Sequence, residues 1–239
     1  PLPATPYVCR PMAAIDRYIH PLQIGSLRLA NNLTLAPMAG FTNVAFRLIA
    51  KEVGGCGLVA SEMVAAMAPG QRRHDKRFHY LTETVPDERP VAMQIYGREP
   101  ELCAATAVEL DRKGADLIDL NCGCPVKKAK QAGCGVALMR EPEQVGRIVA
   151  AIRAATSKPI GVKMRLGFDA ETKNMVEVAQ AAVAGGADVL AVHARTGENK
   201  HGSPVDLSGL AAVKEAVAVP VLANGSMHSA AAIRAAKDE

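Results

Sequence analysis

The chain has 239 residues, of which 49% are hydrophobic and 3% aromatic, and its net charge is +4. This length suits one large domain, and a single (β/α) barrel runs to about 250 residues. The scarcity of aromatic rings argues against a surface that stacks several bases, and the small positive charge permits a polyanionic partner without requiring one. The sequence contains no signal-peptide pattern and no long apolar run, so we expect a cytoplasmic protein without a membrane segment.

The first part of the chain predicts few regular elements. Residues 1–20 contain four prolines and no hydrophobic period, so we expect an extended leader. Residues 20–28 are typical of a small hairpin around Gly25 and Ser26. Strands are expected at 32–36 and 57–60, with a helix at 43–53 between them. The charged segment 69–80 is expected to be irregular, with one helical turn.

A faint internal repeat begins near residue 89. Strands that follow a proline, at 89–95, 158–164 and 219–225, alternate with strands that follow Gly-Ala-Asp, at 114–120 and 186–192. Helical patterns at 99–113, 142–156, 172–184, 206–217 and 228–237 separate them. This alternation predicts a parallel α/β sheet. Seven βα units without a Gly-x-Gly-x-x-Gly turn favour a TIM-type (β/α)8 barrel, truncated after its seventh unit, over an open doubly wound sheet.

Polar residues gather where the predicted strands end. They are Pro37-Met38-Ala39, Ser61-Glu62-Met63, Gln94, Asn121 with Cys124, Lys163 with Arg165, His193 with Arg195, and Asn224-Gly225. One buried polar residue is usually satisfied within the core, but a set on one rim is better explained by a polar ligand. A flavin would use an amide at Gln94 and a cation at Lys163, and the loop 224–226 could present N–H groups to a phosphate.

Seven motifs in order resemble those of the tRNA-dihydrouridine synthases. They lie at 37–43 with Phe46 and Arg47, 61–63, 94–97, 119–125 with Lys128 and Gly135, 163–167, 193–196 and 224–225. The resemblance covers about residues 21–230. It implies that 21–239 is an FMN-binding catalytic barrel that reduces uridine in tRNA to 5,6-dihydrouridine. It also implies NADPH or NADH as electron donor, with hydride passing from reduced FMN to C6 and a proton to C5.

The same resemblance implies roles for individual residues. Cys124 matches the proton-donating cysteine, and a thiol is mostly protonated at neutral pH. Residues implied for FMN are Pro37, Met38, Ala39, Gln94, Lys163, His193, Asn224, Gly225 and Ser226, the last standing where Asp is common in the family. Residues implied for the RNA are Asn121, Arg165, Arg195, Lys127 and Lys128.

Each of these roles has a structural alternative. Cys124 could be an inert small hydrophobe, Asn121 could tie the strand end to the following turn, and the lysines could be a solvated charge run. We assign no metal to Cys122, Cys124 and Cys134, because the usual four-ligand spacing is lacking.

Relatives in the family continue into an eighth strand and a helical tRNA-binding domain, which these 239 residues do not contain. We therefore expect a monomeric catalytic part that is incomplete at its C-terminus. One alternative is another FMN barrel acting on a small pyrimidine or enone, which the basic loop after Cys124 argues against. A second is a non-catalytic RNA-binding fragment, which the survival of the motif side chains argues against.

Overall fold

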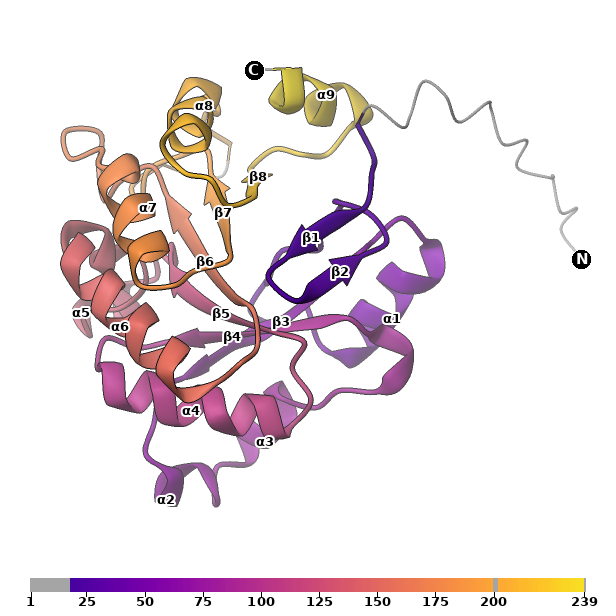
Figure 1. Cartoon of the computed structure of the whole chain (residues 1–239), viewed down its shortest axis with the longest axis vertical. Helices are drawn as coiled ribbons and strands as arrows, with labels where there is room; N and C mark the ends of the chain where they lie inside the picture. The colour runs from indigo at the N-terminus through magenta and orange to yellow at the C-terminus, as the bar shows by residue number, and fades with distance from the viewer. Residues whose placement is uncertain (1–17, 200–201, 239) are drawn as a thin grey trace, which may run out of the picture.

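The computed structural model describes residues 18–199 and 202–238, so most of the leader expected at 1–20 lies outside the described residues. Six parallel strands of this part pair in the order β3-β4-β5-β6-β7-β8 and curve into a partial (β/α) barrel (Figure 1). Their bounds are Val59–Ala65, Val91–Tyr96, Leu117–Cys122, Ile160–Arg165, Val189–His193 and Val221–Asn224. The barrel architecture predicted from the repeat is confirmed.

An antiparallel hairpin precedes the barrel, as predicted. Its strands β1 (Leu22–Ile24) and β2 (Leu27–Leu29) turn at Gly25, which has φ +53°. Ile24 and Leu29 are buried against inward-facing residues near the starts of the barrel strands, namely Leu58, Ala60, Ala92, Leu117 and Val189. The hairpin therefore closes the N-terminal end of the barrel.

Helices α1 (Val44–Val53), α3 (Lys76–Leu81), α4 (Pro100–Arg112), α6 (Pro142–Ala155), α7 (Met175–Ala184) and α8 (Leu207–Ala216) pack on the outer face of the sheet (Figure 1). The connections also contain α2 (Pro69–Arg72), α5 (Lys127–Gln131), and the 3₁₀ turns η2 (Pro86–Glu88) and η3 (Gly135–Arg140), and α9 (Ala230–Asp238) follows β8. Pro100 and Pro142 occupy first helical positions, where a missing N–H costs nothing. Asn43 caps α1 by accepting a hydrogen bond from the Phe46 N–H.

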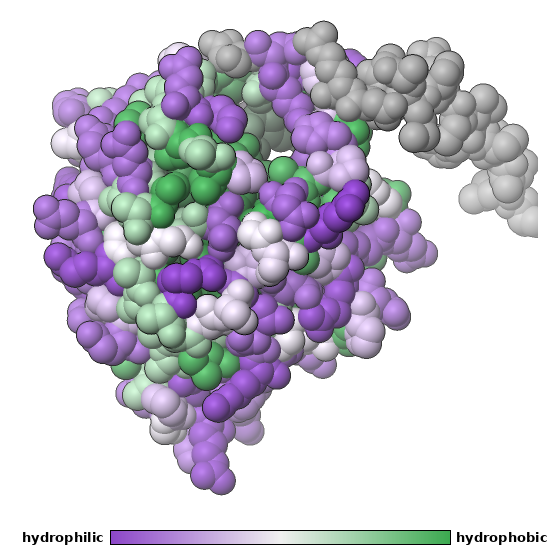
Figure 2. Space-filling model, viewed as in Figure 1, coloured by the Kyte–Doolittle hydropathy of each residue, from purple (hydrophilic) through white to green (hydrophobic). Residues whose placement is uncertain are grey.

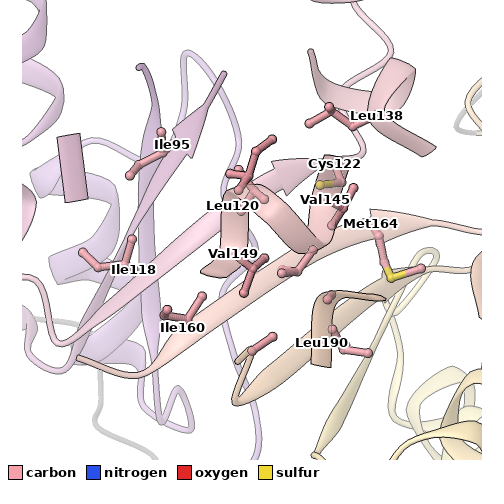
Figure 3. Close-up of a cluster of buried hydrophobic side chains, with 14 of the residues drawn as sticks. Ile95, Ile118, Leu120, Cys122, Leu138, Val145, Val149, Ile160, Met164 and Leu190 are labelled. Carbon is pink, nitrogen blue, oxygen red and sulfur yellow. The ribbon is translucent and has the colours of Figure 1, made fainter. Parts of the chain in front are cut away.

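The main hydrophobic core lies between the sheet and these helices. Outward-facing strand residues such as Ile118, Leu120 and Cys122 pack with Val145 and Val149 of α6 (Figure 3). Successive strand residues point to opposite faces, so the residues between them point into the barrel. This alternation decides which side chains can form a site.

Two local expectations were wrong. The strand expected at 32–36 is reduced to one parallel bridge between Thr34 and Leu58. Leu35 donates its N–H to the Leu58 carbonyl, but the next donor on that edge would be residue 37, a proline without an N–H. The segment 69–80 contains two short helices, and Asp75 caps the second through the N–H groups of Arg77 and Phe78. Within the described ranges no helix is long and apolar enough to cross a membrane.

Candidate functional site

The strand register brings the inward-facing polar residues together at the C-terminal ends of the strands. Gln94 lies opposite Asp119, Asn121 opposite Lys163, and His193 opposite both Arg165 and Asn224. Polar residues of five neighbouring strands, β4 to β8, thus alternate with outward-facing core residues. The predicted rim residues on β4 to β8 therefore form one continuous row of side chains.

A cavity of about 110 Å³ lies inside the barrel beneath this row. Its polar lining includes the side chains of Asp119, Lys163 and Asn224. Its apolar lining includes Leu35, Ala36, Pro37, Leu222 and Met227. Residues from the first segment and from β8 therefore meet around one space, although they are far apart in sequence.

A chain of hydrogen bonds runs from the cavity wall to the turn that carries Cys124. The Gln94 carboxamide donates from Nε2 to Asp119 Oδ2 at 2.6 Å. Its Oε1 accepts from Asn121 Nδ2 at 2.7 Å. Asn121 Oδ1 then accepts from the backbone N–H groups of Gly123 and Cys124, at 3.2 and 2.9 Å. Asn121 thus ties the strand end to the turn, which was the structural alternative for this residue.

Asp119 and Lys163 carry opposite charges in the same cavity. Burial raises the pKa of the Asp119 carboxyl to about 6, although the hydrogen bond from Gln94 and the charge of Lys163 lower it. Burial lowers the pKa of the Lys163 ammonium to about 8, although the charge of Asp119 raises it. Lys163 Nζ donates to Asn224 Oδ1 at 3.1 Å, which uses one of its three hydrogens.

The Cys124 turn is held from several directions. Arg165 is buried, and it donates from Nε to the Gly123 carbonyl at 2.8 Å and from Nη1 to the Thr196 carbonyl at 2.7 Å. The Cys124 carbonyl accepts from the Val136 N–H at 3.0 Å. Gly135 has φ +61°, and a Cβ there would lie 2.6 Å from the same carbonyl. Arg165 was predicted to contact substrate, and the structure places its guanidinium against the backbone of the turn.

The two neighbouring cysteines have different surroundings. Cys122 is fully buried in the core between sheet and helices (Figure 3), where burial raises the pKa of its thiol. Cys124 is half-buried at the rim, on the turn whose Gly123 carbonyl accepts from Arg165. Among the residues that the structure describes, no group of three His, Cys, Asp or Glu side chains is placed to hold a metal ion.

A second polar cluster lies beside the end of β8. The Arg195 guanidinium donates from Nη2 to Ser226 Oγ at 2.6 Å and from Nη1 to His193 Nε2 at 3.1 Å, and it also contacts the Ser203 carbonyl. Gly225 and Ser226 have φ +111° and +55°. A Cβ on Gly225 would lie 2.8 Å from His193 Cδ2, so this loop requires a glycine. Arg195, which was predicted for the RNA, therefore lies among the residues predicted for the cofactor phosphate.

The first rim segment is fixed by a compact turn. Met38 donates to Thr42 Oγ1, and its carbonyl accepts from the N–H groups of Phe41 and Thr42. Gly40 donates to Glu62 Oε2 at 2.5 Å. This turn leaves Met38 and Ala39 exposed at the rim, next to Pro37 in the cavity wall.

Basic side chains surround the turn on the outside. Lys127 and Lys128 begin α5 and are exposed. Arg140 stacks on the Phe168 ring with its guanidinium carbon 3.5 Å from the ring centroid, and Lys130 lies 5.6 Å from the same centroid. The cations of this loop therefore face solvent beside Cys124, whereas Lys163 and Arg165 face the interior.

Sequence reasoning missed Asp119. It was quoted only within the motif 119–125 and given no role, although it shares the inward face of β5 with Leu117 and Asn121. Its spacing of two residues from Asn121 was the available signal. Glu62, quoted only as part of a motif, likewise has a definite contact with the first rim turn.

A parallel (β/α) barrel whose inward-facing polar side chains gather at the C-terminal ends of its strands, above an interior cavity, defines a class of proteins that bind a ligand or perform chemistry at that rim. Comparison with known proteins is more specific. The sequence model described as dihydrouridine synthase (Dus) matches residues 34–239. The chain therefore belongs to the dihydrouridine synthase family.

Curated relatives agree with this assignment. The chain is 38% identical to a probable tRNA-dihydrouridine synthase of Rhodobacter capsulatus, over 91% of this chain and 67% of that protein. It is 39% identical to tRNA-dihydrouridine synthase B of Xanthomonas axonopodis pv. citri, over 87% of this chain and 62% of the relative. The chain thus spans about two thirds of the length of these relatives.

A solved structure supports the fold alone. A 2-naphthoyl-CoA reductase complex superposes with a TM-score of 0.70 at 13% identity, over 93% of this chain and 48% of that one.

Proposed function

We propose that this chain is the catalytic barrel of an enzyme that reduces uridine in tRNA to 5,6-dihydrouridine, with Cys124 as the proton donor. The observation that carries the proposal is the placement of Cys124 on a rigid turn at the rim, next to the Lys163 cavity. A general acid must be held close to the atom that it protonates. Membership of the dihydrouridine synthase family supplies the reaction class.

The polar residues at and beneath the rim fit a flavin mononucleotide. Lys163 offers remaining ammonium donors to an electron-rich ring edge, and Gln94 offers the second hydrogen of its Nε2 amide. The glycine-dependent loop at 225–226, with Arg195 beside it, suits a phosphate. When bound, this cofactor supplies the hydride, with NADPH or NADH as the source of electrons.

Residues of this chain would exclude water, hold the proton and orient the charged groups. Pro37, Leu35 and Leu222 exclude water from one side of the cavity. The Cys124 thiol holds the proton destined for C5 of the base, and Arg165 and Asn121 keep that sulfur in place through the backbone. His193 and Asn224 orient Arg195 and Lys163.

The substrate side of the proposal concerns the exposed cations. A uridine in a folded RNA must leave its stack to reach a barrel rim. Lys127, Lys128 and Arg140 lie outside the Cys124 turn and could meet phosphates on either side of such a base. The chain acts as a monomer in this proposal, because all the named groups come from one barrel.

The proposal is tested on the purified 239-residue chain with the Cys124→Ala variant. We expect a yellow protein with flavin absorbance in both cases, and much faster NADPH-dependent loss of uridine from tRNA with Cys124 than with the variant. Because general acid catalysis typically contributes 10²- to 10⁴-fold, the variant should be slower by about that factor. The matched control is Cys103→Ala, which removes a buried thiol of α4. A yellow protein whose activity is indifferent to Cys124 would contradict the proposed proton donor, and a protein that binds no flavin would contradict the function.

A further inference from the structure

We propose that Asp119 is a positioning residue of this site: its buried carboxyl orients the Gln94 carboxamide and, through Asn121, the backbone turn that carries Cys124. The side chain lies on the inward face of β5 with 7% of its surface exposed. It lies two residues before Asn121 on the same face. Asp119 itself need not touch any substrate, because it acts through two amides.

The polarity of the hydrogen-bond chain supports this role. An ionised carboxylate can only accept, so Gln94 must turn its Nε2 toward Asp119 Oδ2 and its Oε1 away. Oε1 can then only accept, so Asn121 must present Nδ2 to it. Asn121 Oδ1 is thereby aimed at the N–H groups of Gly123 and Cys124. The Asp119 carboxylate accepts at one end of this chain, and the N–H groups of Gly123 and Cys124 donate at the other end. Both ends therefore require the same orientation of the two amides.

The packing around Asp119 is arranged to admit its carboxyl. The register pairs Asp119 with Gly161, and a Cβ on Gly161 would lie 2.8 Å from Asp119 Oδ1. Any larger residue at 161 would push the carboxyl from its place. The opposite charge of Lys163 acts on the carboxyl from the same cavity and favours its ionised, accepting form.

The link to catalysis rests on the proposed function, but the test does not need tRNA or flavin. The reactivity of the Cys124 thiol reports how firmly its turn is held. We would alkylate the native protein with iodoacetamide and quantify the labelling of Cys124 by tandem mass spectrometry, with buried Cys103, which lies on a different tryptic peptide, as an internal folding reference.

Four proteins are compared: the unmodified chain, Asp119→Ala, Asp119→Asn and Asp116→Ala. Asp119→Ala removes the acceptor, whereas Asp119→Asn keeps an oxygen that can accept from Gln94. Asp116 is the matched control, because it precedes the same strand and accepts from the Val91 N–H at 2.8 Å, at the other end of the sheet.

We expect Asp119→Ala to label at Cys124 about 3- to 10-fold faster, the range set by the loss of one hydrogen bond. Asp119→Asn should restore the slow rate to within about twofold, and Asp116→Ala should leave it unchanged on the same scale. An unchanged rate in Asp119→Ala, equal acceleration in Asp116→Ala, or an Asn variant that behaves like the Ala variant would each overturn the proposal.

Different results would contradict the positioning role of Asp119 and the proposed function of the chain. If Asp119→Ala reduced tRNA turnover without altering the labelling of Cys124, the positioning role would be overturned and the proposed function would stand. If the labelling followed the expected pattern in a chain that reduces no uridine, the proposed function would be overturned and the positioning role would stand.

Discussion

At the scale of single residues, the site combines charges that are costly to bury with amides that fix their geometry. Burial raises the pKa of Asp119 and lowers the pKa of Lys163. The charge of each group partly offsets the pKa shift of the other. Groups with pKa values shifted toward neutrality are common where chemistry is performed. Keeping both charged groups buried is expected to lower the free energy of unfolding, as is common at functional sites.

The pH dependence of stability should reveal this cost at Asp119. Its pKa of about 6 in the folded protein exceeds the ordinary value of 3.8, so the folded state binds the proton more tightly than the unfolded state. The stability that this group contributes is complete below pH 4 and is lost as the pH rises through 6. Relative to Asp119→Asn, the free energy of unfolding should therefore fall by up to about 3 kcal/mol between pH 4 and pH 7.

Urea denaturation of both proteins across this range measures the difference. Parallel pH profiles for the unmodified chain and Asp119→Asn would contradict the raised pKa. Lys163 is charged throughout this range, because its pKa of about 8 lies above it.

At the scale of elements, a buried ion pair attaches α1 to the segment before β4. Arg47 in α1 contacts Glu88 of η2 through two hydrogen bonds, at 2.5 and 3.0 Å, and both side chains are at most 2% exposed. Arg47 also donates to the carbonyls of Thr42 and Glu83. Because Thr42 ends the rim turn at Met38, this helix connects the core to the edge of the site.

Removing Arg47 should be costly. Arg47→Ala leaves the Glu88 carboxylate buried without its cation, and we expect a loss of about 3–5 kcal/mol in the free energy of unfolding. Arg112→Ala is the control, because the Arg112 side chain is 75% exposed and lies 3.9 Å from Glu109. It should cost no more than about 0.5 kcal/mol. Denaturant titration distinguishes the two, and equal effects would show that the Arg47–Glu88 pair is not the anchor.

At the scale of the whole molecule, apolar side chains remain on the outer face of α1. Phe46, Ile49 and Val53 are 39%, 58% and 82% exposed. They border a hollow of about 370 Å³ that Leu33 and Leu35 also line. Elsewhere on the surface, Figure 2 shows apolar areas in the region of α8 and β8, and β8 is the least buried strand of the sheet.

Replacing an exposed member of this face should improve solution behaviour without loss of stability. We expect Ile49→Lys to reduce binding of a hydrophobic fluorescent dye and to change the free energy of unfolding by less than about 0.5 kcal/mol. The matched variant Ile148→Lys places the same charge at a fully buried position of α6 and should prevent folding. A substantial loss of stability in Ile49→Lys would mean that this face is covered in the native protein.

Sequence periodicity was sufficient for the layout of the barrel. The Pro-initiated and Gly-Ala-Asp strands predicted β4 to β8, and helix patterns located α4 and α6 within a few residues, because buried strands and amphipathic helices have periods that can be read locally. Local signals failed at 32–36, where Pro37 ends the ladder, and at 127–131 and 135–140, where short helical turns depend on the packing of the Cys124 loop.

The sequence alone identified which side chains gather at the rim. Its motifs also implied the class of reaction. Only the tertiary structure decided their partners: that Asp119 joins them, that Gln94 lies between Asp119 and Asn121, and that Arg165 holds the turn while Arg195 meets Ser226. The physical reason is that alternation along a strand specifies which face a residue occupies. The register between strands, which depends on the closure of the whole sheet, specifies which groups meet there.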